Sequence, residues 1–320
     1  MLLDTPEPPQ GDAAAIMLPP QIKRKYYQLT LRLLKAEYLP KMDTWGTCDG
    51  FIQNTFKNKT LKTNTVTVKN DRLLWNQEFL IPLQMPLLNE RIVLKVYDQD
   101  KTCSNLFGSM LFNKTKIMEL QEMHSISGEA QCFWSHIYGA SLSASGEQAE
   151  IANSNEELAS TWNGRVLMQV EGNITEEPQW ICQEIDPLIQ HQMESVGNTK
   201  YRIRCDVIQG VALPENDDYR VQLKIGEQEF TTDSPKIFKN YYHFWNYRIN
   251  KTFEAPYKDF NQFPDIFIYL IKDNKGITFA RLNARDFLKR SAEKQWIELK
   301  IDKGLDKVAE PYKAGLLQVK

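Results

Sequence analysis

Short apolar stretches with a period of two residues recur along the whole chain, and they exclude most fold classes. The stretch YYQLTLRLLKAEYLP at 26–40 alternates apolar and polar residues until Pro40 ends the pattern. Similar strand-length stretches follow at 51–56, 61–69, 76–83, 91–98, 106–112, 133–138 and 164–171. Alternation over such short lengths is typical of half-buried β-strands. The first half of the chain is therefore predicted to be an antiparallel β-structure.

The same layout starts again near residue 201. The stretch YRIRCDVIQGVALP at 201–214 has the same layout as 26–40. Each is an alternating strand that ends in Leu-Pro. Further stretches follow in the order of their counterparts, at 219–226, 243–253, 265–273, 294–301 and 314–320. A chain of 320 residues has room for about two domains. We predict an all-β protein of two antiparallel eight-stranded β-sandwiches in tandem, with short helices in the connecting loops.

The predicted domain boundaries follow shifts in composition. Residues 1–25 are rich in proline, so we expect an extended N-terminal arm there, followed by the first domain at 26–172. A charged stretch with two prolines at 173–198 is expected to be a linker. The second domain is then expected to cover 199–320.

Two segments of the first half depart from the strand pattern. Residues 113–123 carry Ile117, Met118 and Leu120 at helical spacing, which predicts a short surface helix. Residues 140–160 are polar and rich in small side chains, and we expect a mobile loop there.

Composition excludes several classes of function. The 39 Lys and Arg nearly balance the 41 Asp and Glu, which argues against a nucleic-acid-binding protein. No apolar run is long enough to span a bilayer, and the N-terminal stretch does not read as a signal peptide. The 5 cysteines have no CxxC spacing, so we expect free thiols in a reducing, cytoplasmic compartment.

Catalytic motifs are absent from the sequence. It contains no G-x-S-x-G, GxxxxGK[ST], HExxH or GxGxxG pattern, and its 4 histidines are scattered. We therefore expect a protein that is not an enzyme.

Acidic residues gather in two turns of the first domain. Asp43 and Asp49 flank a glycine in LPKMDTWGTCDGFI, and Asp98 and Asp100 end the strand of VYDQDKTCSNLFG, before Asn105. Side chains at positions i and i+2 of a strand point to the same side, so these carboxylates can converge from neighbouring loops. Their mutual repulsion is relieved by a hard cation, and Ca²⁺ accepts many oxygen ligands in flexible geometry. The alternative is that each aspartate simply forms a turn.

These motifs resemble those of C2 domains. The segments LPKMDTWGTCDGFI, LLWNQEF at 73–79 and VYDQD with the later Phe-Gly carry the likeness. The resemblance implies an eight-stranded sandwich that binds phospholipid in a Ca²⁺-dependent way. It also implies calcium ligands at Asp43, Asp49, Asp98 and Asp100, and places a fifth, normally acidic, position at the neutral Asn105.

Longer segments resemble the middle portion of ferlins, which are membrane-fusion and membrane-repair proteins with many C2 domains. The similar segments are GDAAAIMLPP (11–20), WSHIYGAS (134–141), WNGRVLMQVE (162–171), LPENDDYRVQLKIGEQEF (213–230) and FPDIFIYLIKDNKGITFAR (263–281). We expect a short ferlin-like tandem without the helical insert and the membrane anchor of that family.

The resemblance implies a peripheral membrane protein of the cytoplasm with an anionic phospholipid surface as partner. Bound Ca²⁺ would cancel the repulsion between the acidic loops and the headgroups, while Lys41 and Lys101 would add attraction. Trp45 would either insert at headgroup depth or pack on its own domain. The second domain is expected to lack a calcium site, because its first loop is reduced to Glu215-Asn216-Asp217-Asp218 and its third has only Asp273.

A function of another class stays open. Both sandwiches could serve as protein-binding units of a scaffold in a larger assembly, such as a ciliary or cytoskeletal complex. The lack of calcium ligands in the second domain favours this alternative.

Overall fold

The computed structural model describes residues 25–40, 48–69, 72–85, 91–100, 104–113, 115–119, 132–141, 143–186, 197–213, 217–239, 242–257, 262–288, 293–302 and 315–320. The predicted N-terminal arm lies outside these ranges up to residue 24. None of the helices in the described ranges is long and apolar enough to cross a bilayer.

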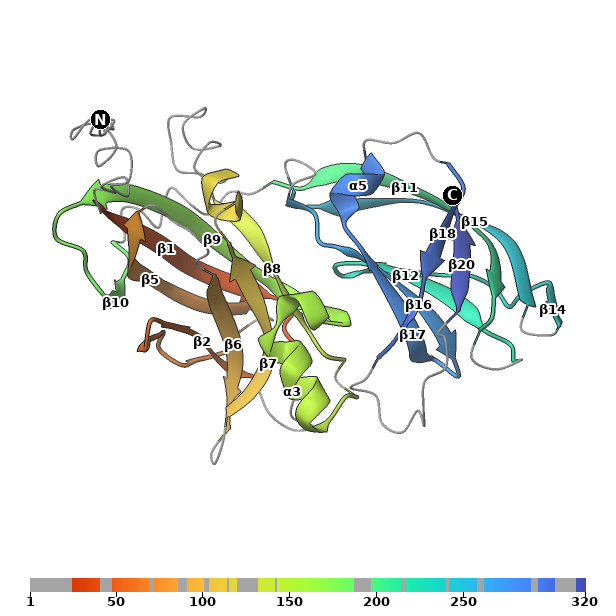
Figure 1. The fold of residues 1–320 in the computed structure, drawn as a ribbon, viewed down its shortest axis with the longest axis horizontal. Coiled ribbons are helices and arrows are strands. Elements are labelled where there is room, and N and C mark those ends of the chain that lie inside the picture. The colour runs from red at the N-terminus through yellow and green to blue at the C-terminus, as the bar shows by residue number, and fades with distance from the viewer. Residues whose placement is uncertain are drawn as a thin grey trace, which may run out of the picture.

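The first half of the chain folds into a β-sandwich (Figure 1). Its strands are β1 (Lys25–Glu37), β2 (Asp49–Phe56), β3 (Lys59–Lys62), β4 (Val66–Thr67), β5 (Arg72–Met85), β6 (Ile92–Gln99), β7 (Ser104–Phe112), β8 (Phe133–Gly139), β9 (Thr161–Thr175) and β10 (Ile181–Glu184). They follow the order β10-β5-β1-β9-β8-β7-β6-β2-β3, with β4 beside β2. A single paired position, Ser109 with Tyr138, connects β7 to β8. The chain there folds over from one layer to the other.

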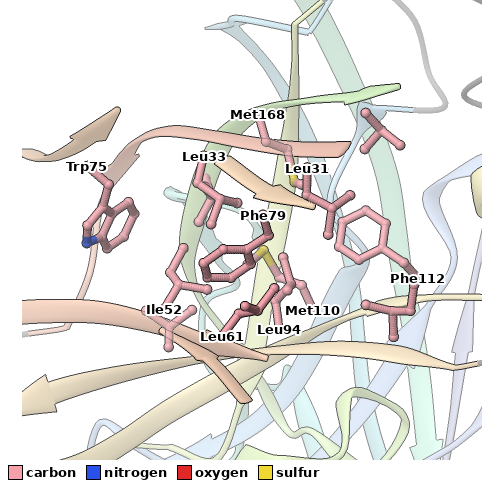
Figure 2. Packing of buried hydrophobic residues seen from close by; sticks show 14 of the residues in the cluster. Leu31, Leu33, Ile52, Leu61, Trp75, Phe79, Leu94, Met110, Phe112 and Met168 are labelled. Atoms are coloured by element: carbon pink, nitrogen blue, oxygen red, sulfur yellow. The ribbon is translucent and has the colours of Figure 1, made fainter. Parts of the chain in front are cut away.

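The core lies between these two layers, as Figure 2 shows. Leu31 and Leu33 of β1 and Phe79 of β5 point toward Ile52 and Leu94 of the opposite layer, and all five are fully buried. Because strand side chains alternate between faces, every second residue of the predicted apolar stretches reaches this core. The period of two in the sequence is thus the pattern of burial in the structure.

The second half forms a second sandwich of two five-stranded sheets. Its strands are β11 (Thr199–Val211), β12 (Arg220–Ile225), β13 (Gln228–Thr231), β14 (Ile237–Lys239), β15 (Tyr242–Ala255), β16 (Ile266–Lys272), β17 (Lys275–Leu282), β18 (Gln295–Glu298), β19 (Lys300–Ile301) and β20 (Leu316–Val319). The sheet orders are β14-β15-β11-β20-β18 and β13-β12-β16-β17-β19. The predicted all-β fold is therefore confirmed, and the structure adds short strands such as β13 and β14 that the sequence pattern did not indicate.

Equivalent contacts show that the two sandwiches repeat one plan. In the first, Trp75 Nε1 donates to the Gly50 carbonyl oxygen at 3.0 Å, and in the second Trp245 Nε1 donates to that of Tyr219 at 3.1 Å. Each tryptophan is followed by an asparagine with positive φ, at a bulge where the strand register shifts. Asparagine tolerates this left-handed conformation better than most residues. The Trp-Asn pairs at 75–76 and 245–246 therefore show which residues of the two sandwiches correspond.

The prediction of a mobile loop at 140–160 is wrong. This segment contains α3 (Gly146–Ser154) and a 3₁₀ turn at Glu156–Leu158. Ala149 and Ala152 lie three residues apart on one face of α3 and are buried. Small side chains let the helix approach the sandwich closely, so packing rather than propensity stabilises it. Composition alone did not reveal this face.

Other connecting segments follow the prediction in part. Residues 115–119 are helical within the helix expected at 113–123. A short helix, α5 (Ala284–Leu288), lies in the second sandwich. The stretch expected to be a linker, 173–198, contains β10, which pairs with β5 and so belongs to the first sheet.

A buried junction joins the two sandwiches. Trp134 and Leu167, from β8 and β9, share an apolar cluster with Tyr257 of the second sandwich. Beside it the Arg165 guanidinium, with 5% of its side chain exposed, binds Glu37 at 2.8 Å and the Tyr257 hydroxyl at 3.2 Å. A charge buried this deeply needs these partners. The relative position of the two sandwiches is therefore specified by matched side chains.

His136 lies at the centre of this junction. The indole N–H of Trp162 donates to His136 Nδ1 at 3.0 Å, so Nε2 carries the proton and donates to the Gln262 carbonyl oxygen at 2.8 Å. Burial lowers the pKa of His136 from 6.5 to about 3, because the charged form is poorly solvated there. The junction thus holds a neutral histidine.

A second contact surrounds Arg281 of β17. Its guanidinium binds Asp265 within its own sandwich and stacks on Tyr138 of the first, 4.1 Å from the ring centroid. It also donates to the carbonyl oxygen of Glu156, in the segment that follows α3. The segment 140–160, which was predicted to be a loop, therefore contributes to the junction.

Candidate metal site

Three neighbouring strands bring the described candidate ligands to one end of the first sandwich. Gly50, next to Asp49, pairs with Asp98 across β2 and β6, and Asp98 pairs with Asn105 across β6 and β7. Asp100 follows the end of β6. Strand register therefore brings Asp49, Asp98 and Asn105 to the same end of the sandwich.

Asp49 and Asp98 are in direct contact. The backbone N–H of Asp49 donates to Asp98 Oδ1 at 2.7 Å, and Asp98 is 2% exposed. Asp49 Oδ1 is itself buried and accepts no hydrogen bond from any described residue. A buried carboxylate oxygen without a donor is costly unless a cation or water reaches it.

Core packing holds the backbone beneath these carboxylates. A Cβ on Gly50 would lie 2.3 Å from Leu73 Cδ1, so the strand approaches the core closely there. On its other side, the Gly50 carbonyl oxygen accepts the Trp75 indole N–H. Both contacts fix the positions of Asp49 and Asp98.

Asp100 and Asn105 form a separate pair. Asn105 Nδ2 donates to Asp100 Oδ2, and the Gln99 amide donates to the Asp100 carbonyl oxygen at 3.1 Å. Within the ranges that the structure describes, no group of three His, Cys, Asp or Glu side chains comes together closely enough to hold a metal ion. The structure thus brings Asp49 to Asp98 and Asp100 to Asn105, but not all of them around one point.

The remaining candidates lie outside the described residues. These are the metal candidate Asp43 and the candidate lipid contacts Lys41, Trp45 and Lys101. The side-chain atoms that could bind a metal in the described candidates are all oxygens, apart from the amide nitrogen of Asn105. Oxygen ligands suit a hard cation such as Ca²⁺, and the buried Asp49 oxygen fits a ligand role.

The corresponding end of the second sandwich holds a lysine instead of an aspartate. The bulge between Leu270 and Ile271 matches the one between Val96 and Tyr97, which places Lys272 at the position of Asp98. The Lys272 ammonium group binds the Asp217 carboxylate. The hydrogen bond that Lys272 donates to this carboxylate is the main cause of the lowered pKa of Asp217. Sequence analysis did not recognise Lys272, although the repeat could have identified its position.

One known family matches part of the first sandwich. The C2 domain family matches residues 27–131, which include Asp49, Asp98, Asp100 and Asn105. This part of the chain is therefore similar to C2 domains. Ferlin 2 of Tetrahymena thermophila is 27% identical over 198 residues, and mouse Myoferlin is 22% identical over 192 residues. The chain is thus similar to ferlins over part of its length.

The similarity covers unequal parts of the chains. It takes in 59% of this chain but 11% of Ferlin 2, and 51% of this chain but 9% of mouse Myoferlin. Among solved structures, the two tandem C2 domains of extended-synaptotagmin 2 align with a TM-score of 0.33 and 11% identity. That alignment covers 100% of this chain and 96% of the other.

Proposed function

We propose that the first sandwich is a calcium-dependent module that docks on anionic phospholipid membranes. The observation that carries this proposal is the contact between Asp49 and Asp98, with a buried Asp49 oxygen that no described residue satisfies. Matched relatives are named ferlins, and this supports a membrane role. The protein would act as a peripheral membrane protein of the cytoplasm, not as an enzyme.

Five residues would hold the ion in this proposal: Asp43, Asp49, Asp98, Asp100 and, by its amide oxygen, Asn105. When bound, Ca²⁺ supplies positive charge and open coordination positions for phosphate oxygens. Asp49 and Asp98 keep the binding-competent contact, while Asp100 must exchange its hydrogen bond from Asn105 for the ion. The cost of that exchange would make affinity modest.

Membrane contact would involve the neighbouring loops. Without the ion, the carboxylates repel anionic headgroups. Lys41 and Lys101 would contribute roughly 1 kcal/mol each near an anionic surface, and Trp45 would insert at headgroup depth. The second sandwich would not take part through calcium, since Lys272 already occupies the position of Asp98.

Sedimentation with phosphatidylserine vesicles tests the proposal directly. The wild-type chain should sediment with vesicles in Ca²⁺ and remain in the supernatant with chelator. The double variant Asp98→Asn and Asp100→Asn should lose this dependence, whereas Asp273→Asn, in the corresponding turn of the second sandwich, should keep it. If the wild-type chain shows no calcium-dependent sedimentation, the scaffold function replaces the membrane function.

A further inference from the structure

A pocket of about 230 Å³ lies where the two sandwiches meet. Residues of β1, β5, β8 and β9 line it on the side of the first sandwich. On the other side it is lined by Asn198, which precedes β11, and by Pro256, which follows β15. The volume is several times the roughly 30 Å³ that a water molecule takes in the liquid. The pocket therefore has room for a small ligand that touches both sandwiches.

Positive charge exceeds negative charge in this pocket. Its described lining contains three basic side chains, Lys35, Arg72 and Arg165, but a single acidic one, Glu37. Strand register brings them together, because Glu37 of β1 is paired with Arg72 of β5 on one side and with Arg165 of β9 on the other. The described lining thus carries two positive charges more than its own carboxylate can neutralise.

Glu37 binds the three basic groups unequally. Arg165 Nη2 lies 2.8 Å from Glu37 Oε2, whereas Arg72 Nε and Lys35 Nζ lie 3.3 and 3.6 Å from Oε1. Charge-assisted hydrogen bonds of nitrogen to oxygen are usually about 2.7–2.9 Å long. Glu227 of the second sandwich is 3.8 Å from Arg165, but it does not line the pocket. Lys35 and Arg72 therefore keep donor capacity for a second anion.

A buried tryptophan adds a further donor. Trp134 lines the pocket and is 4% exposed. The Arg165 guanidinium and the Lys35 ammonium group lie over its ring, 4.3 and 5.5 Å from the centroid. Its Nε1 is buried and donates to no acceptor among the residues that the structure describes. A buried N–H group without an acceptor is unfavourable, and an anion in the pocket would bring acceptor oxygens beside this ring.

A phosphate group matches this set of donors. Guanidinium and ammonium groups are the usual protein partners of phosphate oxygens. A phosphate monoester carries about −1.5 to −2 charges at neutral pH, which is the excess that the described lining leaves open. A singly charged anion would neutralise only part of that excess.

We propose that this pocket binds a phosphate dianion, either free or as a phosphate monoester, between the two sandwiches. The phosphate accepts hydrogen bonds from Lys35 and Arg72 of the first sandwich and from the Asn198 amide of the second. It thereby strengthens the junction that Arg165 and His136 already form. This inference does not depend on calcium, because none of the described pocket residues is a proposed calcium ligand.

The probe is inorganic phosphate added to the full chain. The indole N–H resonance of Trp134, identified as the one that Trp134→Phe loses, should shift saturably in NMR spectra as phosphate is added. Chloride at matched ionic strength screens charges without offering a dianion, and should not reproduce the shift. If phosphate causes no saturable shift beyond that of chloride, the proposal is wrong.

Two arginine variants test the position of the site. Arg72→Gln removes a charged donor that is largely exposed, so the fold should persist, and phosphate should bind roughly tenfold more weakly. Arg91, which binds Glu157 at the surface and does not line the pocket, provides the matched control Arg91→Gln. That variant should bind phosphate as the wild type does. Equal affinity of the two variants would contradict a site at Arg72.

Removing the competing carboxylate should have the opposite effect. Glu37→Gln leaves the buried Arg165 with less compensation, so the melting temperature should fall without phosphate. Phosphate should then bind more tightly than to the wild type and raise the melting temperature by a larger amount. A rise smaller than that of the wild type would show that Glu37 does not compete with an anion.

Vesicles distinguish the sources of the phosphate group. Phosphatidylcholine vesicles with phosphatidic acid present a monoester, and chelator excludes the calcium-dependent binding proposed above. Sedimentation of the wild-type chain but not of Arg72→Gln would identify a lipid headgroup as ligand. If neither chain sediments while free phosphate shifts the Trp134 resonance, the ligand is a soluble phosphate.

Discussion

Lys272 occupies in the second sandwich the strand position that Asp98 occupies in the first. Both follow the bulge shared by the paired strands, β6 with β7 and β16 with β17. Asp98 accepts the Asp49 N–H, whereas Lys272 binds the Asp217 carboxylate. The same arrangement of strands thus holds paired aspartates in the first sandwich and a lysine in the second. In the second sandwich, the Lys272 ammonium group supplies the positive charge beside the carboxylate.

Replacing this lysine should change the titration of its partner. In Lys272→Met, the Asp217 pKa should rise toward its ordinary value, because the hydrogen bond from Lys272 is the main cause of its lowering. NMR titration of the Asp217 side chain measures the shift. Lys251→Met, on the exposed part of β15, is the control and should leave this pKa in place. An unchanged Asp217 pKa in Lys272→Met would show that the ion pair does not form.

A carboxylate at position 105 should strengthen calcium binding. Asp98 and Asn105 are paired across β6 and β7, so Asn105→Asp adds a negative charge beside the proposed ligands. Without Ca²⁺ the added repulsion should lower the melting temperature of the variant below that of the wild type. With Ca²⁺ the melting temperature of the variant should equal or exceed that of the wild type. Thermal unfolding with chelator and with Ca²⁺ measures both effects. Asn105→Ala removes the amide without adding charge, and should show no such recovery.

The junction between the sandwiches should weaken in acid. The folded-state pKa of His136 is about 3 and lies below its ordinary 6.5, so the folded protein binds fewer protons than the unfolded protein between these values. The contribution of His136 is complete above pH 6.5 and is lost as the pH falls, by about 1.4 kcal/mol per pH unit. Denaturant unfolding at several pH values measures this slope. His136→Gln cannot titrate there, and a slope equal to that of the wild type would contradict the prediction.

A methyl group at Gly108 should disturb the place where the first sandwich folds over. A Cβ at this position would lie 2.4 Å from the backbone oxygen of Tyr138, beside the single pair that connects β7 to β8. Gly108→Ala should therefore lower the free energy of unfolding by about 1–3 kcal/mol. Gly276→Ala is the control, because its nearest neighbour would be Tyr269 Cδ1 at an ordinary 3.5 Å. Equal stability of the two variants in urea would refute the steric argument.

Much of the fold could be predicted from local patterns. The apolar alternation at 26–40 and 201–214 gave the strands β1 and β11, because burial in a sheet follows every second residue. The helix α3 was missed, since its buried face consists of Ala149 and Ala152, which sequence patterns do not distinguish from a polar loop. Strands such as β13 and β14 were missed because three or four residues carry little periodicity.

The candidate site could be predicted only in part. The spacing of Asp98 and Asp100 at the end of a strand indicated an acidic loop, and register then brought Asp49 to Asp98. The hydrogen bond between Asn105 and Asp100 had no signal in the sequence, because residue spacing does not specify which side-chain atoms will meet. The role of Lys272 required alignment of the two sandwiches through their bulges.

The sequence by itself determined the strands, the tandem repeat and the acidic residues, because these depend on neighbours along the chain. Only the tertiary structure decided which residues meet across it. The junction around His136 and Arg165 arises from the packing of distant segments, where burial and hydrogen bonding depend on partners that local spacing does not specify.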